Sequence, residues 1–426
     1  MKINTGVSMQ DSLFYFFLMI STVLYIYSLN FLGINISLFR ILFVLWCIIF
    51  IFDLLLFKKK LKKSYGVLFG VYILIIIINL IDWFRLDVNS LFRKDIINHI
   101  INMSLVVLVV AYINNEKKLD AAIRFYILGS LVALFVAVFS VIVGHLPFEG
   151  IIRANQSELR ANTNFINYGT SGYRLTSSFT DPNFYGLYLC FVIILCIYLY
   201  NYVEKRRYIN VLIILNVVAL VLTLSRTALL GLAAIIVVCI CKIRGWLVKM
   251  MLALSAIALV SVIVLLFNFE KVDSSIFLKR LEDTKSVYSR VAYWENGLKV
   301  FTDNPIIGGG SRLLSGGDNG SPVASAHIVY LSLLAKYGLI GFFIYAIFLI
   351  YPIYIVVKNK NKLSEKYVFL IVVVYSSIFI MYWVYDFFQF LEFQYLIFGF
   401  IYSIILNRIG LVEAGVPLKA KQASLK

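Results

Sequence analysis

The sequence predicts an all-α polytopic membrane protein with about twelve transmembrane helices, both termini in the cytoplasm and two long extracytoplasmic loops. Hydrophobic residues make up 62% of the 426-residue chain and charged residues 14%, whereas soluble domains have about 45–50% apolar and about 25% charged residues. Apolar runs close to the roughly 20 residues of a membrane-crossing helix recur along the chain. These observations exclude a soluble, fibrous or disordered protein and make residues 1–426 a single integral membrane domain.

The apolar runs set the expected spans in order. The first run has no small-residue cleavage site after a basic start, so we interpret it as a retained helix and not as a signal peptide. A polar cytoplasmic tail, residues 408–426, is expected after the last span. The spans are expected at residues 12–29, 36–57, 65–84, 96–113, 121–146, 183–203, 209–224, 226–241, 247–268, 338–357, 366–385 and 391–407.

Basic residues set the orientation, because cytoplasmic loops of membrane proteins are enriched in Lys and Arg. The run Lys58–Lys63 places the loop after the second span inside, and every second loop after it is also basic. In this topology the inner side holds 23 of the 39 cationic residues and only 7 acidic ones, so the net charge of +17 is a topology signal. A nucleic-acid partner is therefore not implied. The outer side is biased toward Arg, whose planar fork suits anionic ligands.

The first long extracytoplasmic loop, residues 147–182, ends in a polar stretch that runs into the sixth span. Pro182 is placed at the first position of that helix with Asp181 as its N-cap, which an ordinary helix start explains. A helix start does not explain Arg174 or Asn183, which we interpret as candidate binding residues.

A polar break, Leu224–Thr227, interrupts an apolar run that is too long for one span. The run suffices for two spans joined by a tight outer turn, which places Arg226 at the outer membrane boundary. A charge there is costly unless it is paired or faces a cavity. The alternative is an interfacial arginine that extends its side chain to water.

The second long loop, residues 269–337, is expected to carry amphipathic helices. Apolar residues recur at helical spacing over Ser289–Phe301, so we predict a helix that begins near Arg290 and stops at Pro305. The following run Gly308–Gly310 either brings backbone N–H groups close to an anion or forms a flexible turn.

His327 is the histidine of these two loops, and it precedes a half-buried helix, Ile328–Tyr337, that leads into the tenth span. A neutral imidazole near pH 7 can accept a proton from a sugar hydroxyl or donate a hydrogen bond to a phosphate oxygen. We expect packing or interfacial roles for His99 and His145.

Together, these segments resemble the O-antigen polymerase and O-antigen ligase superfamily of bacterial inner membranes. In ligases the residue after the histidine is usually Asn, Ser or Gln, whereas here it is Ile328, which favours a polymerase over a ligase. The segments that carry the resemblance are Arg174-x-x-x-Ser178-Phe179-x-Asp181-Pro182-Asn183, Ser225-Arg226, Arg290…Trp294…Gly297…Pro305…Gly308-x-Gly310 and His327-x10-Gly338-x-x-Gly341.

The resemblance implies inverting glycosyl transfer from an undecaprenyl-pyrophosphate-linked glycan to a sugar hydroxyl, without a metal or another cofactor. A pyrophosphate leaving group needs charge neutralisation more than protonation, and Arg226 and Arg290 can supply it by bidentate contacts. His327 is the candidate that orients or deprotonates the acceptor hydroxyl. The remaining candidates for substrate binding are Arg174, Asp181, Asn183 and Glu295, of which Glu295 is also an alternative base.

The resemblance also implies a place and partners for the protein. It implies a multi-pass protein of the bacterial inner membrane with its active site facing the periplasm, in contact with membrane lipids, a flippase and a chain-length regulator. A ligase that transfers glycan to lipid A–core remains an alternative. A lipid-linked-oligosaccharide transporter is a third reading, but carriers place ionisable groups near the midplane of the membrane and often have repeated halves.

Overall fold

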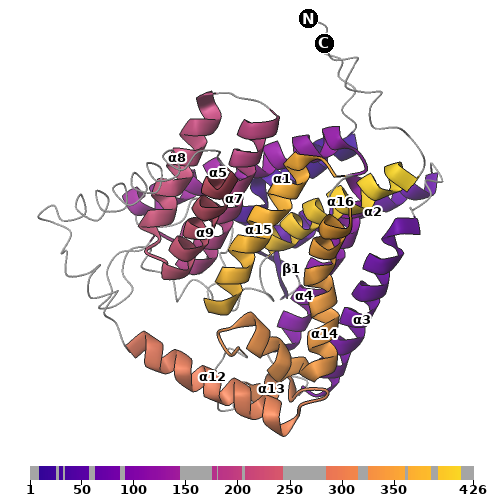
Figure 1. Ribbon diagram of the computed structural model, residues 1–426, viewed down its shortest axis with the longest axis vertical. Coiled ribbons are helices and arrows are strands. Elements are labelled where there is room, and N and C mark those ends of the chain that lie inside the picture. Colours follow the sequence, from indigo (N-terminus) through magenta and orange to yellow (C-terminus); the bar gives the residue numbers. More distant parts are fainter. Residues whose placement is uncertain are drawn as a thin grey trace, which may run out of the picture.

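The structure is a computed structural model. In the part of the chain that it describes, the protein is a bundle of helices (Figure 1). The described residues are 9–24, 28–31, 34–56, 63–86, 92–143, 175–179, 181–203, 207–242, 285–314, 325–359, 363–384 and 392–413. The helices are α1 (Met9–Leu24), α2 (Leu38–Leu56), η1 (Lys63–Tyr65), α3 (Gly66–Phe84), α4 (Phe92–Tyr112), α5 (Glu116–Val143), α7 (Pro182–Tyr202), α8 (Arg207–Leu222), α9 (Arg226–Lys242), α12 (Lys285–Asp303), α13 (Gly310–Leu314), α14 (Val329–Lys358), α15 (Glu365–Val384) and α16 (Glu392–Glu413).

Every expected span coincides with one of these helices, except the span at 247–268, which lies outside the described residues. Among the described residues, five helices (α3, α5, α7, α14 and α15) are long and apolar enough to cross a membrane. Shorter apolar helices occur in α2, α4, α8, α9 and α16. The protein is thus a helical membrane protein, while the number of twelve spans and the orientation stay predictions.

Several helix boundaries differ from the sequence-based expectation, and two of these differences change the interpretation of a segment. The expected first span continues to residue 29, but a hairpin of strands β1 (Ser28–Phe31) and β2 (Ile34–Ser37) occupies the region between α1 and α2. Asn30 and Asn35 pair across this hairpin, and asparagine favours turns over helix interiors. At the other end, α16 continues to Glu413, into the segment expected to be a polar tail.

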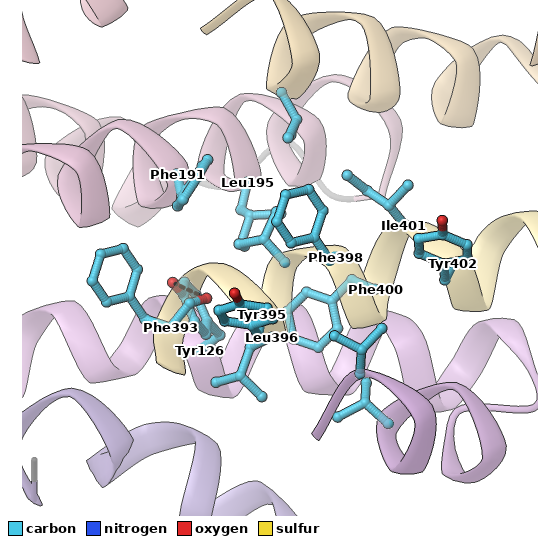
Figure 2. Close-up of a cluster of buried hydrophobic side chains, with 14 of the residues drawn as sticks. Tyr126, Phe191, Leu195, Phe393, Tyr395, Leu396, Phe398, Phe400, Ile401 and Tyr402 are labelled. Atoms are coloured by element: carbon cyan, nitrogen blue, oxygen red, sulfur yellow. Dashed lines mark hydrogen bonds between the residues drawn. The ribbon is translucent and has the colours of Figure 1, made fainter. Parts of the chain in front are cut away.

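Helix α16 forms the centre of the bundle. Its described side chains from Glu392 to Asn407 are all buried, and Figure 2 shows aromatic side chains extending from it toward the helices around it. A helix that is apolar on every side and buried on every side belongs to the core of a large bundle. Helices α4 and α14 pack directly against it.

Small residues set the closest helix crossings. A Cβ atom on Gly186 of α7 would lie 2.4 Å from Cβ of Ala228 in α9, and one on Gly231 would lie 2.6 Å from Sδ of Met381 in α15. Small residues allow such close approach of backbones, on which helix association in membranes depends. Helices α7, α9 and α15 therefore form a tightly packed group.

Polar contacts gather at the end of the bundle that the basic loops assign to the cytoplasm. Asp11 accepts a hydrogen bond from Tyr112 and pairs with Lys118, whose Nζ lies 3.0 Å from its Oδ1. Lys366 pairs with Glu116. These contacts join the first turn of α1, the end of α4 and the starts of α5 and α15, as alternating spans require.

Candidate active site

The start of α7 has the cap that the sequence predicts. The Asp181 side chain accepts a hydrogen bond from the backbone N–H of Asn183 at 2.6 Å, and Pro182 occupies the first helical position. The cap satisfies a backbone donor that a helix start otherwise leaves without a partner. In this structure, Asp181 acts on the backbone of α7, and Asn183 follows in its first turn.

The segment Leu175–Phe179, just before α7, is non-helical and packs inside the bundle. The N–H of Leu175 donates to the carbonyl of Leu222 at 3.0 Å, and the Ser177 hydroxyl donates to the carbonyl of Ala133 in α5. The Phe179 ring stacks on Tyr185, with centroids 5.3 Å apart. Irregular backbone among membrane helices is tolerated where protein covers it, so this segment is a built part of the site.

The polar break between α8 and α9 lies directly against the start of α7. Ser225 accepts a hydrogen bond from the N–H of Ala228 at 3.2 Å, and it donates one to Oδ1 of Asn183 at 2.6 Å. Ser225 is fully buried, whereas Arg226 is half-buried at the first position of α9. The structure therefore brings Asn183 and the Ser225-Arg226 pair together, and it confirms two helices joined by a tight turn.

Helix α12 carries Arg290 and Tyr293 on the side that faces the start of α14. A Cβ atom on Gly297 would lie 2.7 Å from Cβ of Ala326, so the two backbones approach closely here. Arg290 is half-buried one turn before Tyr293. Glu295 is exposed and lies on another side of the helix. The predicted amphipathic helix is confirmed, although it begins at Lys285 and not near Arg290, and Glu295 does not join this group.

His327 lies in a turn held by two serines. Its N–H donates to Oγ of Ser325 at 2.9 Å, and the N–H of Ala326 donates to Oγ of Ser332 at 2.9 Å. The His327 ring lies against the ring of Tyr293, with centroids 4.5 Å apart. Contacts between α12 and α14 thus place the histidine beside the helix that carries Arg290.

Backbone strain coincides with the predicted motifs. Among the described residues, three non-glycine residues have a positive φ: Ser177 (54°), Leu224 (49°) and His327 (54°). Such conformations cost about 1–3 kcal/mol each and gather at functional sites. One precedes α7, one precedes Ser225-Arg226, and one is the histidine itself. Strain therefore marks the same places that the sequence singled out.

The site has two halves: one at the start of α7 with Ser225-Arg226, and one at His327 with α12. Aromatic side chains connect them. Tyr330, in the first turn of α14, lies 5.2 Å from Trp383 at the end of α15, measured between ring centroids. The hydroxyl of Tyr382 donates to Oε1 of Gln394 at 3.2 Å. The adjacent Phe393 packs against Phe179, with centroids 5.5 Å apart. A continuous series of contacts thus runs from the His327 turn to the segment before α7.

The glycine run Gly308–Gly310 does not form the anion-binding loop considered from the sequence. The N–H of Gly309 donates to the carbonyl of Ala335 at 2.8 Å, and a Cβ atom on Gly308 would lie 2.5 Å from the nitrogen of Gly338. Gly338 has φ 61° and breaks α14 at this crossing. The glycines therefore allow two backbones to touch, and the amides of Gly308 and Gly309 donate to backbone carbonyls of the fold.

A buried carboxylate fixes the same segment to α3. Asp82 is 1% exposed, and its two oxygens accept hydrogen bonds from Ser311, from N–H at 2.9 Å and from Oγ at 2.6 Å. Arg85 donates from Nη1 to the carbonyl of Gly308 at 3.0 Å. The contact between Asp82 and Ser311 was not predicted, because nothing near Asp82 in the sequence indicates a partner more than two hundred positions away.

His99 has the packing role expected for it. Its ring nitrogens lie 2.6 Å from the hydroxyl of Tyr345 and 2.9 Å from the hydroxyl of Tyr395. Asn79 extends the network to Tyr345 and Tyr337. Arg174 and His145 lie outside the described residues. The polar partners Ser325, Ser332 and Gln394 were also missed, since isolated serines and a glutamine at a helix start carry no motif.

The fold and the site define the class: a helical membrane protein with strained turns between its helices, two half-buried arginines and a histidine. Residues 211–346 match the model of a protein family described as O-antigen ligase. The match confirms the resemblance to the O-antigen polymerase and ligase superfamily, whose members are glycosyltransferase-like enzymes. The matched segment includes Arg226, Arg290 and His327, while Asp181 and Asn183 precede it. No curated protein matches the chain.

Proposed function

We propose that the protein is a polymerase of O-antigen or a related surface polysaccharide in the bacterial inner membrane. It would transfer an undecaprenyl-pyrophosphate-linked glycan chain to the non-reducing end of another lipid-linked repeat unit on the periplasmic face. The observation that carries the proposal is the coincidence of the strained turns with the motifs that resemble the superfamily. These turns hold Arg226 and His327 within the residues that match the family model.

The donor site is assigned to the arginines. Arg226 is the first residue of α9, where the helix dipole favours an anion. Its guanidinium and that of Arg290 would contact the pyrophosphate and stabilise the charge that develops as the glycosidic bond breaks. Because the leaving group is a weak base, no general acid is required. The negative charge stays on the pyrophosphate, which departs with its lipid.

The acceptor site is assigned to His327. The imidazole would accept the proton of the attacking sugar hydroxyl, and the new glycosidic bond would form on the face opposite the leaving pyrophosphate, which inverts the anomeric carbon. The ring of Tyr293, 4.5 Å from that of His327 between centroids, limits how the imidazole can turn. The exposed Glu295 lies on another side of α12, so we prefer His327 as the base.

The lipid-linked intermediates of a host strain test this function. We would delete the gene, separate the surface glycan on a denaturing gel and extract the glycans that remain on the lipid carrier. The proposal expects one repeat unit per anchor and no ladder of longer chains. Single lipid-linked units trapped on the cytoplasmic face would instead indicate a transporter and would contradict the proposed site.

A ligase is the second candidate, because the matching family is described as O-antigen ligase. It would use the same donor and transfer the glycan to lipid A–core. Support for the polymerase comes from Ile328 after the histidine and from the Asp181-Pro182-Asn183 segment, which resembles the segment before the sixth span of O-unit polymerases. In the same deletion strain, long polymer stranded on the lipid carrier and no repeat units on the surface would identify a ligase.

A further inference from the structure

The turn after α12 exposes two large apolar side chains. Ile306 is 63% exposed and Ile307 is 54% exposed. The preceding turn of α12 has exposed polar side chains, Thr302 and Asp303. The turn therefore presents two adjacent apolar side chains next to polar ones, and an exposed apolar patch of this kind marks a surface for another apolar partner.

The position of the turn is fixed by the break in α14. The N–H of Leu339 donates to the carbonyl of Pro305 at 2.8 Å, and the N–H of Ile340 donates to the carbonyl of Ile306 at 3.1 Å. These bonds use backbone groups that the Gly338 break leaves without helical partners. The turn is thus attached to the first residues of the long part of α14.

That part of α14, residues 339–358, is about 30 Å long at 1.5 Å per residue, which matches the hydrocarbon thickness of a bilayer. Leu339 and Ile340 therefore lie where the membrane helix meets the boundary of the hydrocarbon region. Because Ile306 is hydrogen-bonded to Ile340 through the backbone, the turn lies at the same depth.

The exposed surface of the turn continues the exposed apolar stripes of two membrane helices. On α14 the exposed apolar residues recur at helical spacing, at Ile340, Phe343, Ile347, Ile350, Tyr354 and Val357. On α3 they are Ile73, Leu74, Ile77, Leu80, Ile81 and Phe84, the last of which is 80% exposed. Stripes of this kind on membrane-crossing helices face lipid. The turn lies beside Ile340, where the α14 stripe ends.

The turn is also held rigidly from inside. Arg85, the residue after α3, donates to the carbonyl of Gly308 at 3.0 Å, and Asp82 binds Ser311 through both carboxylate oxygens. With the hydrogen bonds to Leu339 and Ile340, these contacts keep Ile306 and Ile307 pointing away from the bundle. The two isoleucine side chains are therefore not placed to fold back into the core.

We propose that Ile306 and Ile307 insert into the membrane and bind the acyl chains of the leaflet on the α12 side. The occupant is lipid and not protein, because the patch lies beside Ile340 at the end of the lipid-facing stripe of α14 and is bonded through Arg85 to the end of α3, which carries a second such stripe. The turn would anchor the end of α12, which runs across this end of the bundle (Figure 1), to the bilayer surface. This inference does not depend on the proposed enzymatic activity.

Photocrosslinking in proteoliposomes of the full-length protein tests this insertion. The photoreactive residue p-benzoylphenylalanine would replace Ile306 or Ile307, one position per variant, in vesicles of phosphatidylethanolamine and phosphatidylglycerol. Phe343, on the exposed stripe of α14, is the positive control, and Thr302, in the last turn of α12, is the matched negative control. Mass spectrometry would then identify what each position has crosslinked.

We expect phospholipid adducts at Ile306 and Ile307 in a yield similar to that at Phe343. At the control position Thr302 we expect no phospholipid adduct. Two positions are used so that a local disturbance at one of them does not decide the result. A crosslink from both positions to a second copy of the chain or to another of its segments would overturn the proposal. So would the absence of any lipid adduct at both positions while Phe343 gives one.

Discussion

The hydrogen bond between Ser225 and Asn183 gives the sharpest test of how the two motifs cooperate. Ser225 is fully buried, and its hydroxyl has two roles: it accepts from the N–H of Ala228 at 3.2 Å and donates to Asn183 at 2.6 Å. Asn183→Ala removes only the second of these bonds. Ser225→Ala removes both, and the first of them is the side-chain cap at the start of α9.

The magnitudes follow from these bonds. Loss of a neutral hydrogen bond costs about 0.5–1.5 kcal/mol, and loss of a helix cap costs about 0.5–2 kcal/mol. Asn183→Ala should therefore destabilise the protein by about 1 kcal/mol, and Ser225→Ala by about 2 kcal/mol. In the double variant the shared bond is lost only once. Its effect should be about 1 kcal/mol smaller than the sum of the two single effects.

Thermal unfolding in detergent, followed by intrinsic tryptophan fluorescence, measures these changes in the stability of the protein. Complementation of the deletion strain measures function, because a displaced Arg226 should shorten or remove the glycan ladder in both single variants. Ser332→Ala is a control from the other half of the site, since Ser332 contacts the His327 turn and not Asn183. Strictly additive effects of Asn183→Ala and Ser225→Ala would refute the reasoning that the two motifs act through this bond.

Three further predictions concern the proposed chemistry and its support. Arg226→Ala and Arg290→Ala should each lower glycan polymerisation by about 10²–10³-fold while the protein still inserts, and the Lys variants should fail as well because the bidentate fork is lost; near-normal glycan chains would contradict a pyrophosphate site. His327→Ala should abolish chain extension in the complementation assay, and full activity would remove this residue from its proposed role. Ser311→Ala, which loses a hydrogen bond to the buried carboxylate of Asp82, should destabilise the protein by about 1.5–3 kcal/mol, measured as a lower Tm; an unchanged Tm would mean that this bond does not hold α13 to α3.

Patterns confined to one stretch of sequence predicted most of the fold. Apolar length identified the helices, and the polar break at Leu224–Thr227 correctly divided one long run into α8 and α9. The cap at Asp181 and the helix that ends before Pro305 were also predicted correctly, because helix starts and stops depend on neighbouring residues. The hairpin between α1 and α2 was missed, since its short strands lie beside strongly apolar runs.

The parts of the site that depend on distant contacts were not predictable from one sequence. The glycine run suggested an anion site, but its geometry depends on Gly338 and on the carboxylate of Asp82, which the fold brings to it. Likewise, Glu295 was a reasonable base within its own segment, and only the packing of α12 against α14 shows that it lies on another side of the helix. Local sequence indicated which residue types are present, while the fold determined which of them meet.

The central position of α16 has a consequence for how the protein is made. Translation produces this helix last among the described elements, yet α4 and α14 pack directly against it. The helices made earlier are therefore synthesised before the partner that they share, and the contacts that they make with α16 form last. Completion of the bundle therefore follows the synthesis of α16, and the site cannot assume its final geometry before this helix has been made.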